Sequence, residues 1–170
     1  MVTLAASLNA LSDRLDKVMR LIGVIFLMII VMSSFLQVFT RYVLNSSLFW
    51  TEECARFAFI WATMFGAAVG VKSKSHAAVD FLVSRLRGKA RNINLLSVDI
   101  MILIMGVLLI YAGCEMLTLV HKQLSPALRI PMSYVYGGIP VGAVGIVVHA
   151  LTNIVNTVAP LETCADGCRE

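Results

Sequence analysis

LFWTEECAR, residues 48–56, opens the second long apolar run of the chain. In a helix that starts at its tryptophan or one residue later, Arg56 shares a face with Glu52 and Glu53, because residues three and four apart are neighbours on a helix. Ionisable side chains at the edge of a membrane span are costly unless they are paired. We consider two interpretations: a helix end whose charges neutralise one another, and a docking site at which a partner protein completes the pairing.

The same stretch has the composition of a helix amino terminus. Glu52 and Glu53 fall in the first turn, where the helix dipole favours negative charge. Asn45 or Thr51 is placed to accept hydrogen bonds from the free backbone amides of that turn. We therefore predict that one of these two side chains caps the helix.

The whole chain is unusually apolar. Of its 170 residues 59% are hydrophobic and only 14% are charged, whereas ordinary soluble domains carry about 25% charged residues. The apolar residues fall into four runs, each roughly long enough to cross the hydrocarbon core of a bilayer. The sequence therefore predicts an all-α integral membrane protein. We expect a single membrane domain over residues 1–170, with transmembrane helices at about 18–40, 50–71, 93–120 and 132–158 and a polar tail at 159–170.

The segment between the second and third runs is the most basic part of the chain. Apolar residues recur there at helical spacing from Ala78 to Leu86, which predicts an amphipathic helix at about 76–87 that lies on the membrane surface. His76 and Asp80 lie one turn apart in it, and we expect a local hydrogen bond between them rather than a metal site. The basic side chains expected to face lipid phosphate are Lys72, Lys74, Arg85, Arg87, Lys89 and Arg91.

The distribution of Lys and Arg predicts which ends of the helices face the cytoplasm. With four spans, ten of the 14 basic residues fall on the side of the two termini and the basic segment, and four fall on the other side. Because basic residues concentrate in cytoplasmic loops, we expect both termini in the cytoplasm. Residues 48–56 and the loop at 126–131 then share the outer face of the membrane.

Small residues inside two of the runs predict close helix packing. Gly66 and Gly70 lie four residues apart in the second run. Gly138 and Gly142 flank Pro140 in the fourth run, where we expect a kink packed against a neighbouring helix. The candidate partner-interface residues are Trp50, Glu52, Glu53, Arg56, Gly66, Gly70, Arg129, Gly138 and Gly142.

Sequence motifs for catalysis or nucleotide binding are absent. The chain has no phosphate-binding loop, no glycine-rich dinucleotide turn, no HExxH and no GxSxG. Cys164 and Cys168 in the tail lack further ligands for zinc, and the three histidines do not form a pair at one membrane depth that could bind haem. We therefore expect a protein that is not an enzyme, with no catalytic residues, no metal site, no cofactor and no nucleic-acid partner.

Asp99 and Glu115 are candidates for ion or proton handling, because ionisable residues inside membrane spans are usually functional. They lie near opposite ends of the third run, however, and we find no paired repeats with polar groups converging at the midplane, as in self-sufficient transporters. This pattern favours a companion subunit over the translocating protein. Two alternatives stay open: a stand-alone four-helix exporter or channel with one of these carboxylates as its ion site, and a structural anchor for a membrane redox enzyme.

Four motifs in order carry a resemblance to a known family. They are residues 37–45 (QVFTRYVLN), 50–56 (WTEECAR), 76–80 (HAAVD) and 126–131 (PALRIP), the last followed by Tyr134 and Tyr136. Together with the four predicted helices they resemble the small membrane subunit (DctQ-like) of tripartite ATP-independent periplasmic (TRAP) transporters. The resemblance extends from the first predicted helix through the fourth and leaves out the polar tail.

The resemblance implies a secondary transporter of three proteins. A periplasmic substrate-binding protein captures an organic acid, a large membrane subunit carries it inward with sodium, and this small, non-catalytic subunit braces the large one. The implied location is the bacterial inner membrane, as a multi-pass protein in contact with lipid. We then expect Glu52, Glu53 and Arg56 to contact the large subunit or the arriving binding protein.

Overall fold

The computed structural model describes residues 2–45, 48–73 and 89–166. Their regular structure is helical and contains no strand, apart from one isolated bridge between Leu124 and Pro131. Four of the helices are long and apolar enough to cross a membrane, as the sequence predicted. The prediction of an all-α membrane protein is therefore confirmed. The helices are α1 (Val2–Val43), α2 (Phe49–Lys72), α4 (Lys89–Val120), α5 (Met132–Tyr136) and α6 (Gly138–Asp166).

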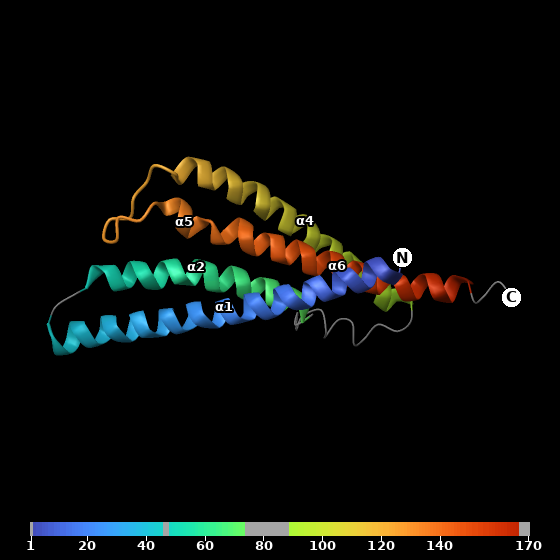
Figure 1. The fold of residues 1–170 in the computed structure, drawn as a ribbon, viewed down its shortest axis with the longest axis horizontal. Helices are drawn as coiled ribbons and strands as arrows, with labels where there is room; N and C mark the ends of the chain where they lie inside the picture. The colour runs from blue at the N-terminus through green and yellow to red at the C-terminus, as the bar shows by residue number, and fades with distance from the viewer. Residues whose placement is uncertain (1, 46–47, 74–88, 167–170) are drawn as a thin grey trace.

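Helices α1, α2, α6 and α4 follow one another side by side in that order in a layer, and toward the two chain termini α1 also packs against α6 (Figure 1). α2 packs against α1 on one side and against α6 on the other, and α6 in turn packs against α4. Helices α1 and α4 are the two edges, and over the described residues they do not contact each other. Only 6% of the most apolar part of α1 is buried within the chain, against 50% for α6. Helix α6 is therefore the centre of the fold, and α1 offers most of its surface to lipid or a partner.

The two ends of the layer differ in what they contain. Both termini lie at one end, and the α4–α5 connection lies at the other end, beside the last turn of α1 and the first turn of α2 (Figure 1). We call the second of these the loop end and the first the terminal end. This arrangement agrees with an even number of membrane crossings between the termini.

The core lies between α1, α2 and α6. Met19, Phe65, Ala68, Ile146 and Ala150 are buried there, together with other apolar side chains. In a membrane, burial of these side chains gains little from the hydrophobic effect, because a lipid tail is as apolar as a leucine. The contact is therefore stabilised mainly by dispersion between closely packed side chains. Small residues on α6 are therefore important, since they bring the helix axes close.

Two glycines of α6 mark this close approach. A methyl group added at Gly142 would lie 2.6 Å from Cβ of Met64, and one added at Gly138 would lie 2.9 Å from the ring of Trp61. Both small surfaces are therefore occupied by α2 of the same chain. By contrast, an added methyl at Gly66 or Gly70 would meet nothing within 4 Å, so that side of α2 stays uncovered by the described part of the chain.

Helix α1 begins much earlier than the apolar run from which its span was predicted. It starts at Val2 rather than near residue 18, because the polar amino-terminal residues continue the same helix without a proline or glycine before Gly23. The carboxyl terminus shows the same effect. Helix α6 continues to Asp166, so residues 159–166 of the predicted polar tail are helical. Loss of hydrophobicity marks where a span ends, but not where a helix ends.

The fourth run is interrupted before Pro140, around which the sequence predicted a kink. The interruption is at Gly137, between α5 and α6, where the Gly137 amide donates to the Ser133 carbonyl oxygen at 2.9 Å. Pro140 falls in the first turn of α6, where a backbone amide has no partner within the helix and its loss costs little.

The predicted amphipathic helix at 76–87 lies outside the described residues. The same holds for the expected hydrogen bond between His76 and Asp80 and for the basic residues Lys74, Arg85 and Arg87. The backbone of Lys89 and Arg91 belongs to α4.

Candidate functional site

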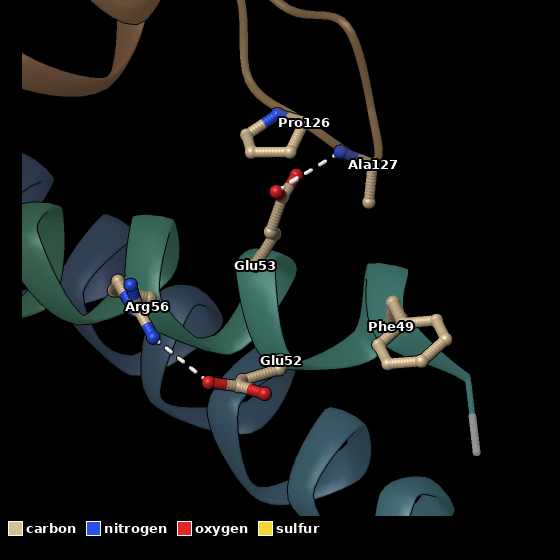
Figure 2. A pocket seen from close by; sticks show the side chains of 6 residues that line it. All are labelled: Phe49, Glu52, Glu53, Arg56, Pro126 and Ala127. Carbon is tan, nitrogen blue, oxygen red and sulfur yellow. Dashed lines mark hydrogen bonds and ion pairs between the residues drawn. The ribbon is translucent and has the colours of Figure 1, made fainter.

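A shallow depression at the loop end joins the first turn of α2 to the α4–α5 connection. It has a volume of about 400 Å³ and contains the charged residues that the sequence singled out (Figure 2). Two carboxylates and one guanidinium from α2 meet two residues of the connection. The lining residues are Phe49, Glu52, Glu53, Arg56, Pro126 and Ala127.

Glu53 points from α2 into the connection. Its carboxylate accepts hydrogen bonds from the Ser125 hydroxyl at 2.6 Å and from the backbone amides of Ala127 and Leu128, each at 3.0 Å. Figure 2 shows the bond from Ala127. Hydrogen bonds to an ionised acceptor are roughly twice as strong as neutral ones. The Ser125 side chain is almost completely buried, so its hydroxyl depends on this partner. Glu53 therefore fastens residues 125–128, which we call the clamped loop, to the start of α2.

The connection is also held together internally. The Ser125 amide donates to the Ile130 carbonyl oxygen at 3.0 Å, and the Met132 amide donates to the Gln123 carbonyl oxygen at 2.9 Å. Arg129 closes the turn in a left-handed conformation with φ of 52°, which costs a non-glycine residue about 1–2 kcal/mol. The surrounding bonds maintain this conformation and leave the Arg129 side chain exposed.

Glu52 and Arg56 form a separate ion pair on the outer side of α2. The Arg56 Nη2 atom lies 2.8 Å from Glu52 Oε1, and 69% and 56% of the two side chains are exposed. The predicted pairing of these two residues is confirmed, but Glu53 is not part of it. The reason is helix geometry, since successive residues point roughly 100° apart. Glu52 and Arg56 are therefore accessible to a partner, whereas Glu53 is occupied within the chain.

The predicted cap of α2 is wrong. Leu48 occupies the capping position and has no side chain that could accept a hydrogen bond. Thr51 lies inside the helix, fully buried, and its hydroxyl donates to the Leu48 carbonyl oxygen at 2.7 Å. Asn45 stands three residues before the cap, with a left-handed φ of 47°. The threonine was misassigned because the helix starts at Phe49, earlier than expected.

Polar side chains at the terminal end join α1, α2 and α6. Ser12 Oγ lies 2.7 Å from His149 Nδ1, and both side chains are buried. Asn153 donates from α6 to the Val71 carbonyl oxygen at 3.1 Å. This junction was not predicted from the sequence, although His149, Asn153 and Asn156 recur at helical spacing inside a predicted membrane helix. That recurrence was the available signal.

Lys72 belongs to the same junction. Its ammonium group pairs with the Asp13 carboxylate of α1, and only 23% of its side chain is exposed. Lys72 is therefore paired within the chain, and its expected contact with lipid phosphate stays a prediction. The early start of α1 supplies the competing partner, because Asp13 lies in the part of α1 that precedes the apolar run.

The two membrane carboxylates of α4 do not form a common site. Asp99 is buried and Glu115 is exposed. They are 16 residues apart, which corresponds to about 24 Å along a helix. Among the described residues, no three His, Cys, Asp or Glu side chains are close enough to hold a metal ion.

A single layer of four membrane-spanning helices, with its charged groups gathered at the two ends, defines a multi-pass membrane protein of the all-α class. The family described as the DctQ component of tripartite ATP-independent periplasmic transporters matches residues 28–159. The chain belongs to this family. It is therefore a small permease subunit of a TRAP transporter and not an enzyme.

Individual relatives support the assignment. The chain is 28% identical over 130 residues to a TRAP transporter small permease protein of Haemophilus influenzae, which covers 76% of this chain and 79% of that protein. It is 32% identical over 125 residues to the sialic acid TRAP transporter small permease protein SiaQ of Vibrio cholerae, covering 71% and 69%. It is 34% identical over 94 residues to the isethionate TRAP transporter permease protein DctMQ of Oleidesulfovibrio alaskensis, covering 54% of this chain but only 15% of that protein.

Proposed function

We propose that this chain braces the large permease subunit of a sodium-coupled TRAP transporter for an organic acid. The observation that carries the proposal is the layer of four helices, whose two edge helices expose long apolar surfaces. The polar side chains that meet between its helices, such as Ser12 and His149, do so at the terminal end and bond to one another. Such a layer has surface for a partner. A brace is therefore a better account of the fold than a translocator.

The partner is supported by the relatives. The permease DctMQ contains the matched region as only 15% of its length, which is what a fusion of a small subunit to a much larger membrane protein predicts. The names of relatives also mention sialic acid, C4-dicarboxylates and isethionate, all of which are organic acids. We propose the same substrate class for the complex that contains this chain. Sodium coupling is proposed from the family resemblance.

We propose the bacterial inner membrane as the location, with both termini in the cytoplasm. The common position of the termini in Figure 1 and the excess of basic residues on their side support this orientation. The loop end then faces the periplasm. We propose that a periplasmic substrate-binding protein, or the large subunit, contacts the exposed side chains there, namely Trp50, Glu52, Arg56 and Arg129.

The alternative of a stand-alone exporter or channel is less well supported. An ion site needs several oxygen or nitrogen ligands around one position. Asp99 and Glu115 lie on different sides of α4 and about 24 Å apart, so neither carboxylate completes a site with the other.

Uptake into proteoliposomes tests the proposal. We expect sodium-dependent, saturable uptake of a labelled organic acid when this chain, its large subunit and its binding protein are all present, and none with this chain alone. Saturable ion-coupled uptake by this chain alone would contradict the proposal. So would an unchanged uptake rate when this chain is left out of an otherwise complete system.

A further inference from the structure

We infer that the outer edge of α4, at Glu115, packs against a transmembrane helix of the large permease subunit that presents a hydrogen-bond donor or a cation to this carboxylate. The inference rests on the proposed function and names the surface through which it is carried out. It follows from the position of one charged side chain in the layer.

Glu115 lies on the side of α4 that faces away from the rest of the chain. The inner side is marked by Gly106 and Gly113, where an added methyl would lie 2.8 Å from Val147 and 3.0 Å from Pro140 of α6. Glu115 follows Gly113 by two residues, which places it roughly 200° around the helix. Its side chain is exposed, and within the described residues its carboxylate makes no hydrogen bond or ion pair.

The surroundings of Glu115 on this edge are mostly apolar, apart from the exposed Thr118 one turn further along. Met101, Leu108, Tyr111 and Leu119 are each more than half exposed on the same span, which runs from Asn94 to Val120. An ionised carboxylate on a lipid-facing helix surface is costly, and such groups almost always face a protein partner or a water-filled cavity. Glu115 lies five residues before the end of α4, about 7.5 Å along the helix, so against lipid alone its carboxylate would have only the interface at that helix end.

The opposite edge of the layer provides the contrast. Helix α1 also exposes a long row of large apolar side chains, including Val24, Met28 and Phe35. Between Arg20 and Arg41, however, it carries no ionisable residue at all. Lipid satisfies the α1 edge completely, whereas only the α4 edge requires a polar partner. We therefore assign the α4 edge to the large subunit and the α1 edge to lipid.

The occupant is a helix of the large subunit rather than a second copy of this chain. Two relatives that match only 15% and 18% of their own length, the permeases DctMQ and SiaT, carry this region within a much longer permease polypeptide. In such a fusion, one small subunit is joined to one large subunit. We therefore expect the large subunit, and not a second small subunit, to cover this surface.

Photo-cross-linking in the assembled complex locates the interface. Tyr111 on α4 and Phe35 on α1 are both exposed aromatic residues, nine and eight residues before the ends of their helices. A benzophenone side chain at either position is thus a matched substitution at similar depth. We expect an adduct with the tagged large subunit from position 111 and none from position 35. An adduct from position 35 together with none from position 111 would overturn the assignment.

Substitution of Glu115 provides a second test, because the expected recovery of the large subunit differs between a carboxylate that faces a protein partner and one that faces lipid. Against a partner, Glu115→Leu removes a hydrogen bond to a charged group and should lower the recovery of the large subunit on affinity purification about tenfold or more. Against lipid, the same change removes a costly charge and should leave recovery unchanged or improved, which would overturn the inference. Ser34→Leu, at an exposed polar residue of α1, is the control and should have no effect.

The two proposals fail differently. If the unsubstituted chains do not co-purify, the proposed function is wrong and the inference falls with it. If they co-purify and Glu115→Leu has no effect, the brace remains and only its assignment to the α4 edge is wrong.

Discussion

Two adjacent glutamates near the start of α2 lie on its inner and outer sides and have different surroundings. Glu53, on the inner side, receives three hydrogen bonds from the clamped loop. Glu52, on the outer side, makes an exposed pair with Arg56. Neighbouring residues point roughly 100° apart around a helix. Glu53 therefore holds the loop within the chain, whereas Glu52 stays accessible to a partner. Two identical side chains in one motif therefore need separate tests.

The comparison also changes the interpretation of the motif. The sequence left two hypotheses open for the charged cluster, a self-neutralised helix end and a docking site. The structure divides the cluster between a fixed carboxylate and an exposed pair. An exposed pair of this spacing contributes only about 0.3–0.5 kcal/mol to stability. If substitution of Glu52 or Arg56 destabilises the complex by more than this amount, we attribute the additional loss to contacts with a partner.

The largest effect on the subunit itself is expected from Glu53→Ala. This change leaves the buried Ser125 hydroxyl and the Ala127 amide without their acceptor, and the Leu128 amide keeps only the Ser125 hydroxyl oxygen. We expect the melting temperature in detergent to fall by about 5–10 °C. Cleavage by trypsin after Arg129 should become at least about tenfold faster, because the loop no longer holds its conformation.

The matched control is Glu53→Gln, which keeps an acceptor oxygen and should lower the melting temperature less. Equal melting temperatures and equal cleavage rates for all three proteins would show that the clamp does not stabilise the loop.

An intermediate effect is expected from Ser125→Ala. The variant loses the 2.6 Å bond to Glu53 and the acceptor of the Leu128 amide, while the carboxylate keeps its two backbone donors. Loss of one buried hydroxyl of this kind costs about 1–2 kcal/mol, or about 2–6 °C in melting temperature. Thermal unfolding monitored by circular dichroism provides the measurement. A loss as large as that of Glu53→Ala would mean that the hydroxyl, and not the set of three donors, holds the loop.

The fold could be predicted from the sequence to the extent that hydrophobicity determines it. Four apolar runs of sufficient length predicted four spans, because lipid requires this length whatever the packing. Their lateral order could not be predicted, since the apolar runs do not show which helix packs against which. The position of α6 between α2 and α4 depends on close contacts such as that of Gly142 with Met64.

The candidate site could be predicted only in part, for a different reason. The pair of Glu52 and Arg56 is local, so helical spacing was enough to predict it. The bond between Glu53 and Ser125 joins residues 72 positions apart, and no periodicity reports such a contact. The pair of Ser12 and His149 at the terminal end is more distant still, at 137 positions. Contacts of this kind require the helix order to be known first.

The smallest effect on the subunit, and the most direct test of the division between the two sides of α2, is expected from Arg56→Ala. The melting temperature of the isolated subunit should change by no more than about 1–2 °C, since the pair is exposed. The uptake rate of the complete transporter should fall about tenfold or more, because Glu52 then loses its pairing at the proposed contact with a partner. An uptake rate equal to that of the unsubstituted complex, or a melting temperature lowered as far as by Glu53→Ala, would contradict the account.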